Sequence, residues 1–389
     1  MTRRGLAGWL GYWPWAVMAA FAAVPFVPGT DAALRGQQFL PLFIYAVLGL
    51  GLNVVLGYTG LFHLGIAAFF GIGAYVTGIL VVPSFPFQQS FLVAVIAATV
   101  AAAAVGVATT APTLRLRGDY LALVTMGFGL IAVFVIRNLE HITAGTKGLN
   151  PVSPRLLPGM DDPNLAPLKV HPTWGAGWRG YPYFYFLCLG VLALTYLFLG
   201  RLERSRVGRA WVAMREDELA ASCMGLNPAR LKLSSIAVAA GLAGLAGALY
   251  AVSQRTTAGP QAYDFSKSMT AICCVILGGL GNRPGVLLGV LLLIGYDMVL
   301  TPELDNEFQK AWFQQMFPES MRGKQYLKMS GWRLFIFGVV LIVMMRFRPE
   351  GLLPERRHEH ELNPGEKSED SGQKSEGGNP NPTTTSPGP

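Results

Sequence analysis

The chain has 389 residues, of which 52% are hydrophobic and only 14% are charged, and its formal net charge is +8. Soluble domains carry about 25% charged residues, so this composition argues against a large soluble core and favours a membrane protein. The positive charge does not indicate nucleic-acid binding, because Lys and Arg gather at the ends of apolar blocks, where they orient membrane helices.

Apolar blocks recur along the chain at close to the length that a helix needs to cross a bilayer, about 20 residues. They predict an all-α, polytopic transmembrane bundle of about ten helices, or eight if the eighth and ninth blocks form a re-entrant hairpin. The predicted segments are 9–28, 38–57, 61–82, 90–111, 119–137, 181–200, 233–253, 266–281, 284–301 and 332–347. The connection between the eighth and ninth is so tight that both interpretations of 266–301 stay open.

Basic residues in the connections predict the orientation of the helices. The Arg-rich loop 201–232 and both termini are placed in the cytoplasm, and the longer connections 138–180 and 302–331 are placed outside. Residues 1–358 are thus expected to form one transmembrane domain. Residues 359–389 contain almost no apolar side chains, which predicts a disordered cytoplasmic tail.

An even number of helices also allows a five-plus-five division, in which the two halves would form an inverted-topology repeat. The stretches 65–75 and 241–250 share a texture of glycine, alanine and a closing tyrosine. Small residues of this kind are equally typical of ordinary helix packing in membranes.

Few polar residues lie within the apolar blocks, and intramembrane polar groups often line a solute path. The candidates for a solute path are Asn53, His63, Gly71, Gly73 and Thr125. For the two glycines close helix packing is the favoured interpretation, and unwound backbone beside a path is the alternative. His63 lies near a predicted helix end, where interfacial water would also satisfy it.

Nothing in the sequence supports catalysis. The chain has no G-x-x-x-x-G-K-[ST] phosphate cradle, no paired catalytic carboxylates and no His or Cys spacing typical of a metal site. We therefore expect no catalytic residue, no metal and no cofactor on this chain. The four cysteines are interpreted as small apolar fillers.

The loop 201–232 contains the most informative pattern. Residues Trp211 to Met224 predict one amphipathic helix, with Trp211, Met214, Glu218, Ala221 and Ser222 on one side. Arg215, Glu216 and Asp217 are expected to be solvated, and Gly225 to end the helix. Such a helix suits insertion into a groove of a partner protein, and a position on anionic lipid is the alternative.

These residues resemble the membrane permeases of ATP-binding-cassette importers for branched-chain amino acids and related solutes. The similarity extends over most of the membrane region, and its order and spacing make it specific. The matching motifs are Gly51-Leu52-Asn53, Gly57-Tyr58-Thr59-Gly60, Ala67 to Tyr75, Leu116 to Ala122, Gly145 to Leu149, Val207 to Ala210, Arg215 to Ala221, Met224-Gly225, Gly278 to Gly281 and Phe347 to Pro354.

The resemblance implies that Glu218-Leu219-Ala220-Ala221, with Gly225, is the motif that couples the permease to its ATPase. The expected coupling residues are Trp211, Arg215, Glu216, Asp217, Glu218, Ala220, Ala221 and Gly225. The resemblance further implies a second permease subunit in a heteromeric pair, two cytoplasmic ATPase subunits and an extracytoplasmic solute-binding protein. It places the chain in the cytoplasmic (inner) membrane of a bacterium, in contact with lipid.

Three features depart from the family pattern. Ile66 stands where the family commonly has histidine, Ala144 stands where it usually has glycine, and 302–331 resembles an insertion. These departures concern the solute, which is an amino acid, an amide or urea in this family. An ion-coupled secondary transporter is the alternative class, but it would need several ionisable groups at the membrane midplane, and the sequence offers almost none.

Overall fold

The computed structural model describes residues 3–23, 32–86, 89–115, 119–150, 183–301, 333–348 and 351–353. All regular structure in these ranges is helical, which confirms the all-α prediction. The connection 138–180 beyond residue 150, the connection 302–331 and the tail 359–389 lie outside the described residues, so the predictions for them stay predictions.

Each of the ten predicted segments overlaps a helix of the structure. The helices are α1 (Arg3–Ala23), α2 (Ala32–Asn53), α3 (Ile66–Val81), α4 (Phe91–Thr110), α5 (Asp119–Asn138), α7 (Tyr183–Arg204), α10 (Pro228–Gln254), α11 (Phe265–Gly278), α12 (Arg283–Gly295) and α15 (Arg333–Phe347). The π-helical turns η2 (Val54–Tyr58) and η7 (Tyr296–Leu300) extend α2 and α12. Shorter helices are α6 (Glu140–Thr143), α8 (Arg206–Glu216) and α9 (Glu218–Cys223), and 3₁₀ turns are Ala111–Arg115, Gly145–Lys147 and Pro260–Tyr263.

Within the described ranges, 5 helical spans are long and apolar enough to cross a membrane by length and composition. They are Phe39–Tyr58, Phe91–Thr113, Tyr120–Asn138, Phe184–Arg204 and Pro228–Gln254. The other apolar helices are shorter. The 14 residues of α11 extend for about 21 Å, less than the roughly 30 Å of a hydrocarbon core. The chain is a membrane protein, but length alone does not establish ten crossings.

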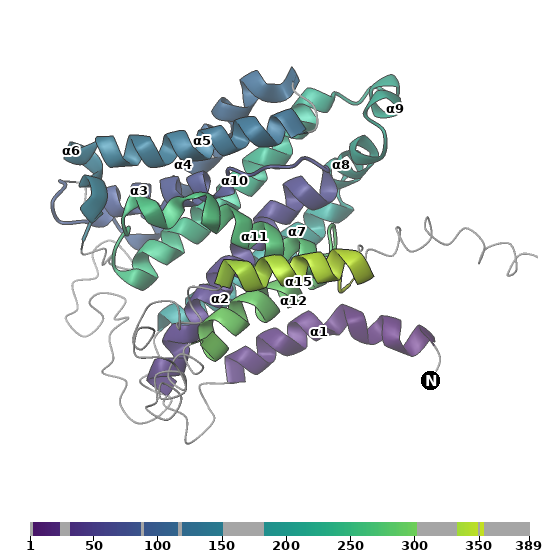
Figure 1. The fold of residues 1–389 in the computed structure, drawn as a ribbon, viewed down its shortest axis with the longest axis horizontal. Coiled ribbons are helices and arrows are strands. Elements are labelled where there is room, and N and C mark those ends of the chain that lie inside the picture. The colour runs from purple at the N-terminus through teal and green to yellow at the C-terminus, as the bar shows by residue number, and fades with distance from the viewer. Residues whose placement is uncertain are drawn as a thin grey trace, which may run out of the picture.

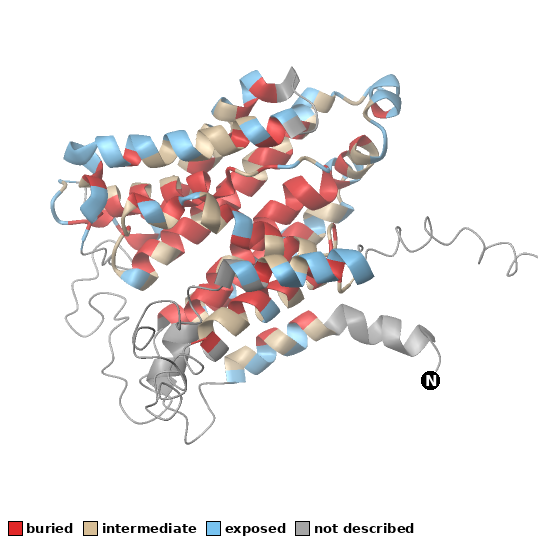
Figure 2. Cartoon of the chain, in the orientation of Figure 1, coloured by how far each residue is buried: buried red, intermediate tan, exposed pale blue. Residues whose placement is uncertain are grey.

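Helices α2, α3 and α10 form the centre of the bundle (Figure 1), and most of their described residues are buried (Figure 2). Glycine allows their backbones to touch. A Cβ added at Gly73 would overlap the backbone of Gly244, and one added at Gly247 would overlap the carbonyl oxygen of Phe70. Lipid gives no hydrophobic drive for helices to associate, so this close contact supplies packing that side chains alone would not. By contrast, α5 and α15 expose apolar outer faces.

The long helices alternate in direction between two ends of the bundle. One end, which we call the α8 end, includes two contacts: Arg215 with Gly57, and Arg283 with Glu203. At this end in Figure 1, α8 and α9 project from the bundle, α1 begins and α15 ends. The beginning of α1, the end of α15 and the segment with α8 and α9 therefore lie at the same end of the bundle.

Helices α3 and α11 both begin inside the bundle rather than at its ends. The backbone N–H of Ala67 in α3 donates to the Oγ of Ser268 in α11 at 3.1 Å. Segment 59–65 precedes α3 and segment 255–264 precedes α11. Both are irregular, except for the 3₁₀ turn Pro260–Tyr263 in the second. The prediction that the third helix starts at residue 61 is therefore wrong by five residues, because helical backbone begins only at Ile66.

Two connections between helices have distinct backbone conformations. Gly57 and Tyr58 end a π-helical turn, and Gly60 has positive φ, 66°. The eighth and ninth segments are two antiparallel helices, α11 and α12, joined at residues 279–282. The backbones of Gly278 and Gly285 touch across this pair, which only glycine permits.

Candidate coupling site and solute path

The projecting loop contains two helices where the sequence predicted one. Helix α8 ends at Glu216 and α9 begins at Glu218, so the predicted single helix from Trp211 to Met224 is wrong. Asp217 lies between them in extended conformation, with φ −154° and ψ 111°. Its carboxylate accepts hydrogen bonds from the backbone N–H groups of Leu219 and Ala220 at 2.8 and 3.0 Å. Asp217 is thus the N-cap of α9, and capping by a carboxylate favours a new helix at this point.

The other ends of the loop are also capped by its own residues. Ser205 Oγ accepts from the N–H of Gly208 and starts α8, and Asn227 Oδ1 accepts from the N–H of Arg230 and starts α10. Gly225 ends α9 with φ 83°, as predicted, and the N–H of Leu226 bonds back to the Ala221 carbonyl. This pattern is a Schellman motif, which a left-handed residue completes. Because α7 continues to Arg204 and α10 starts at Pro228, the predicted 201–232 loop is shorter at both ends.

Trp211 attaches α8 to the membrane helices. Its side chain is fully buried, and its indole N–H donates to the Leu231 carbonyl at 3.1 Å and to Ser234 Oγ at 3.0 Å, both in α10. Met214 and Ala221 are buried on the same side. The predicted apolar side of the loop helix therefore faces the chain's own bundle, where Trp211 is a structural anchor.

The opposite side of α9 is exposed and apolar. We call Leu219, Ala220, Cys223 and Met224 the α9 face. Leu219 and Met224 are 67% and 84% exposed, and Ala220 and Cys223 are also exposed. Large exposed apolar side chains grouped on a projecting helix are typical of a protein–protein contact. This face contains Ala220 from the expected coupling residues, and Leu219 and Met224, its two large side chains, were not among those residues.

Glu218 holds α9 to α10. Its Oε1 lies 2.7 Å from the Nζ of Lys232, whose side chain is only 9% exposed. The predicted coupling residue Glu218 is therefore bound within this chain. Glu216 and Gly225 lie on the solvated side of the loop, with open space around the Cα of Gly225.

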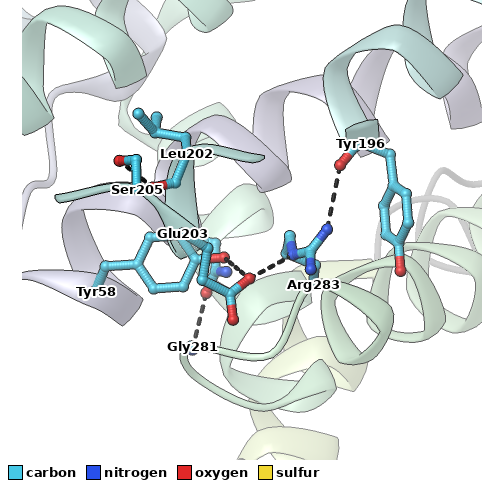
Figure 3. A network of polar contacts seen from close by, with 8 residues as sticks. Tyr58, Tyr196, Leu202, Glu203, Ser205, Gly281 and Arg283 are labelled. Atoms are coloured by element: carbon cyan, nitrogen blue, oxygen red, sulfur yellow. Dashed lines mark hydrogen bonds and ion pairs between the residues drawn. The ribbon is translucent and has the colours of Figure 1, made fainter. Parts of the chain in front are cut away.

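Arg215 connects α8 to the centre of the bundle. It was expected to be solvated, but its Nη1 donates to the Gly57 carbonyl in η2 at 2.5 Å. The neighbouring residue Tyr58 donates its hydroxyl to Glu203 at 3.4 Å, and Glu203 also accepts from Arg283 Nε at 2.7 Å. Figure 3 shows Arg283 between Glu203 and Tyr196, whose carbonyl it also contacts at 3.2 Å.

Asn53 joins this network from α2. Its Oδ1 accepts from the N–H of Gly281, in the turn between α11 and α12, at 3.0 Å. Its Nδ2 is buried with no hydrogen-bond partner among the described residues. Arg215 therefore contacts η2, which extends α2, and Asn53 of α2 contacts the turn between α11 and α12. No pattern in the sequence pointed to Glu203 or Arg283, because their contact depends on how distant helices pack.

The remaining candidates for the solute path divide into two groups. His63 and Thr125 meet around 63–65: the Gly65 N–H donates to His63 Nδ1 at 3.2 Å and the Leu64 N–H to Thr125 Oγ1 at 3.1 Å. Both side chains are buried. Gly71 and Gly73 instead lie in helix contacts, Gly71 against the ring of Tyr263 and Gly73 against Gly244. The structure supports packing for these two glycines, and Asn53 lies apart from both groups.

In the part of the chain that the structure describes, no three His, Cys, Asp or Glu side chains come together in a way that could hold a metal ion. The cysteines there have no partner sulfur, and Cys188 and Cys274 are buried.

Comparison with known proteins identifies relatives along most of the chain. The family described as branched-chain amino acid transport system / permease component matches residues 39–345. The chain is 34% identical over 330 residues to the high-affinity branched-chain amino acid transport system permease protein LivM of Escherichia coli (strain K12), covering 83% of this chain and 70% of LivM. It is 24% identical over 353 residues to a probable LivM of Methanocaldococcus jannaschii, covering 80% and 91%.

A second type of relative matches over a shorter region. The permease protein LivH of Salmonella typhimurium (strain LT2) is 31% identical over 121 residues, covering 31% of this chain and 37% of LivH. No solved structure matches the chain.

Proposed function

Because the chain belongs to the family of branched-chain amino acid transport permeases, we propose that it is the translocating subunit of an ATP-binding-cassette importer. Its solute would be a branched-chain amino acid or a related small amphipathic solute. The observation that carries the coupling to an ATPase is the α9 face, an exposed apolar surface that caps and buried contacts hold firmly on the membrane bundle. The chain would hydrolyse no ATP itself.

The proposed membrane arrangement has ten crossings and two inverted halves. The first half would contain α1 to α5, and the second would contain α7, α10, α11, α12 and α15 with the opposite orientation in the membrane. Each half contains one helix, α3 or α11, that starts inside the bundle. Discontinuous helices at corresponding positions of two halves are typical of transporters with inverted repeats. The α8 end would face the cytoplasm, with both termini, in the inner membrane of a bacterium.

The proposed assembly contains several subunits. LivM and LivH are both permease proteins of branched-chain amino acid transport systems by their names, and the chain resembles both. We therefore expect a second permease subunit and a heterodimeric path. Two ATPase subunits would bind at the α8 end, and a solute-binding protein would bind at the opposite end.

The contacts around α8 support a mechanism for coupling. An ATPase that binds the α9 face would displace α8, and the contact of Trp211 with α10 would transmit that displacement. Arg215 would carry it to the Gly57 carbonyl in η2. A π-helical turn is a frequent site of local rearrangement, so η2 is a suitable hinge between α2 and the segment 59–65. Coupling requires that the ATPase bind two states of the permease with different affinity.

Charge placed on the α9 face tests this proposal. In the complex of all subunits, Leu219→Asp combined with Met224→Asp should lower co-purification of the ATPase about tenfold, because two apolar contacts become charged and buried. Leu219→Met is the matched control, since it keeps the apolar volume. Unchanged co-purification and uptake in the double variant would overturn the docking proposal. Uptake that survives ATP depletion and stops with an uncoupler would indicate the secondary transporter instead.

A further inference from the structure

Lys267 lies among aromatic rings in the centre of the bundle. Its Nζ is 5.2 Å from the ring centroid of Tyr45, 5.6 Å from that of Phe70 and 4.9 Å from that of Tyr250. The three rings belong to α2, α3 and α10, and Lys267 belongs to the first turn of α11. These four residues, which we call the Lys267 cluster, therefore join all the central helices with the second helix that starts inside the bundle.

In the proposed membrane arrangement, the Lys267 cluster lies within the apolar spans, toward the end opposite α8. Tyr250 stands one turn before the end of α10 at Gln254. Tyr45 stands between one and two turns inside the apolar span that begins at Phe39. Just beyond Lys267, Ser268 contacts the buried first turn of α3. A charged side chain at such depth is costly and in membrane proteins usually marks a path for solute or ions.

The cluster has one closed and one accessible side. Phe70 is 1% exposed, whereas Tyr45, Tyr250 and Lys267 are half-buried. Phe70 also stacks on Tyr250 and Tyr263, with centroids 5.4 and 5.9 Å apart, so the aromatic wall is continuous. Cation–π contacts stabilise an ammonium by about 0.5–2 kcal/mol, which helps to hold the Lys267 charge beside the rings, and part of the Lys267 side chain is exposed.

We propose that the Lys267 cluster is a solute-binding station at the outer part of the path, and that it selects a small carboxylate-bearing, amphipathic solute. The lysine ammonium would bind the carboxylate, and the partly exposed rings of Tyr45 and Tyr250 would cover the apolar side chain. This inference rests on the proposed function and narrows it, because a neutral amide or urea presents no charge to the ammonium. A charge-assisted hydrogen bond is about twice as strong as a neutral one, which favours the carboxylate.

The test measures uptake per ATP hydrolysed by the complete transporter in proteoliposomes, with leucine-saturated binding protein outside. For Lys267→Cys we expect uptake per ATP to fall about tenfold, while stimulation of ATP hydrolysis by the loaded binding protein persists. Treating this variant from outside with 2-aminoethyl methanethiosulfonate places an ammonium at the position and should restore uptake. The neutral methyl reagent should not. Arg137→Cys, at an exposed cation at the end of α5, is the matched control and should leave the ratio unchanged.

Two results would overturn the proposal. One is uptake per ATP equal to that of the parent chain in Lys267→Cys. The other is a parallel loss of uptake and of stimulated hydrolysis that the aminoethyl reagent does not restore, since this indicates a purely structural lysine. If the parent chain itself shows no ATP-dependent uptake, the proposed function fails instead, so the two failures are distinguishable.

Discussion

The central helices and the projecting α8–α9 segment are held in place by different physical means. At the centre, glycines bring backbones into direct contact, as at Gly73 with Gly244 and Gly247 with Phe70. In α8–α9 the positions are set by capping side chains, one buried tryptophan and a few polar contacts. A side-chain contact can be weakened by a conservative substitution, whereas any side chain added at these glycines would push the two backbones apart.

This difference fits the roles proposed for the two regions. In the proposed function the bundle lines the solute path and needs a fixed shape, and close packing resists deformation. The α8–α9 segment would transmit the movement of the ATPase, which requires firm attachment to the bundle and an exposed outer face; Trp211 is buried and Leu219 is exposed. Substitutions at the centre should therefore lower the stability of the whole chain, and those in α8–α9 should mainly lower coupling.

The largest effect is expected where the two regions meet. Trp211→Ala removes a fully buried ring and should lower the local stability of α8 by about 4 kcal/mol. Hydrogen exchange should then become faster in α8 and α9 and stay unchanged in α3. Trp211→Phe keeps most of the ring and should cost about 1 kcal/mol through the lost indole hydrogen bonds. Equal acceleration in α3 would show that the two regions are not separable.

The centre is tested by a matched pair of glycine substitutions. Gly247→Ala places a methyl group against the Phe70 carbonyl and should lower the free energy of unfolding by about 3 kcal/mol. Gly127→Ala has nothing within 4 Å of the added Cβ and should be neutral or slightly stabilising. The midpoint of thermal unfolding in detergent measures both. Similar midpoints for the two variants would show that backbone contact at glycines does not stabilise the central helices.

A smaller effect is expected at the cap between α8 and α9. Asp217→Ala should cost about 1 kcal/mol, because the N–H groups of Leu219 and Ala220 lose their acceptor. Asp217→Asn keeps a capping oxygen and serves as the control. We expect co-purification of the ATPase to fall modestly in Asp217→Ala, with the thermal midpoint of the bundle unchanged. A lower midpoint would mean that the cap stabilises the bundle itself.

The smallest effect is expected at the ion pair between α9 and α10. Glu218→Gln keeps an acceptor for Lys232 and should cost about 0.5 kcal/mol, since the carboxylate is 36% exposed to solvent. ATPase co-purification at low and high salt measures it. A loss as large as that of the double substitution on the α9 face would show that Glu218 contacts the ATPase directly.

The helices of the bundle were predictable because apolar length is a local property of the sequence. All ten predicted segments overlap helices, and the prediction that Gly225 ends α9 is confirmed because only a residue tolerant of positive φ suits that position. The break at Asp217 was readable in principle, since aspartate is a strong N-cap, but the amphipathic pattern around it continues without interruption.

Other features depend on tertiary structure and could not be predicted. Arg215 has the sequence context of a solvated residue, yet it reaches the Gly57 carbonyl 158 positions away. The late start of α3 and the rings around Lys267 likewise arise from contacts between distant helices. Contacts between distant helices produce no periodic pattern in the sequence.

The most direct test of the docking proposal uses the native Cys223 on the α9 face. Cys223 is exposed, whereas the other cysteines of the described residues are buried or half-buried in membrane helices. A maleimide-linked benzophenone at Cys223 in the assembled, transporting complex should cross-link to the ATPase subunit on illumination, and Cys223→Ser should abolish the product. Cross-linking to lipid alone, in a complex that still transports, would contradict the account.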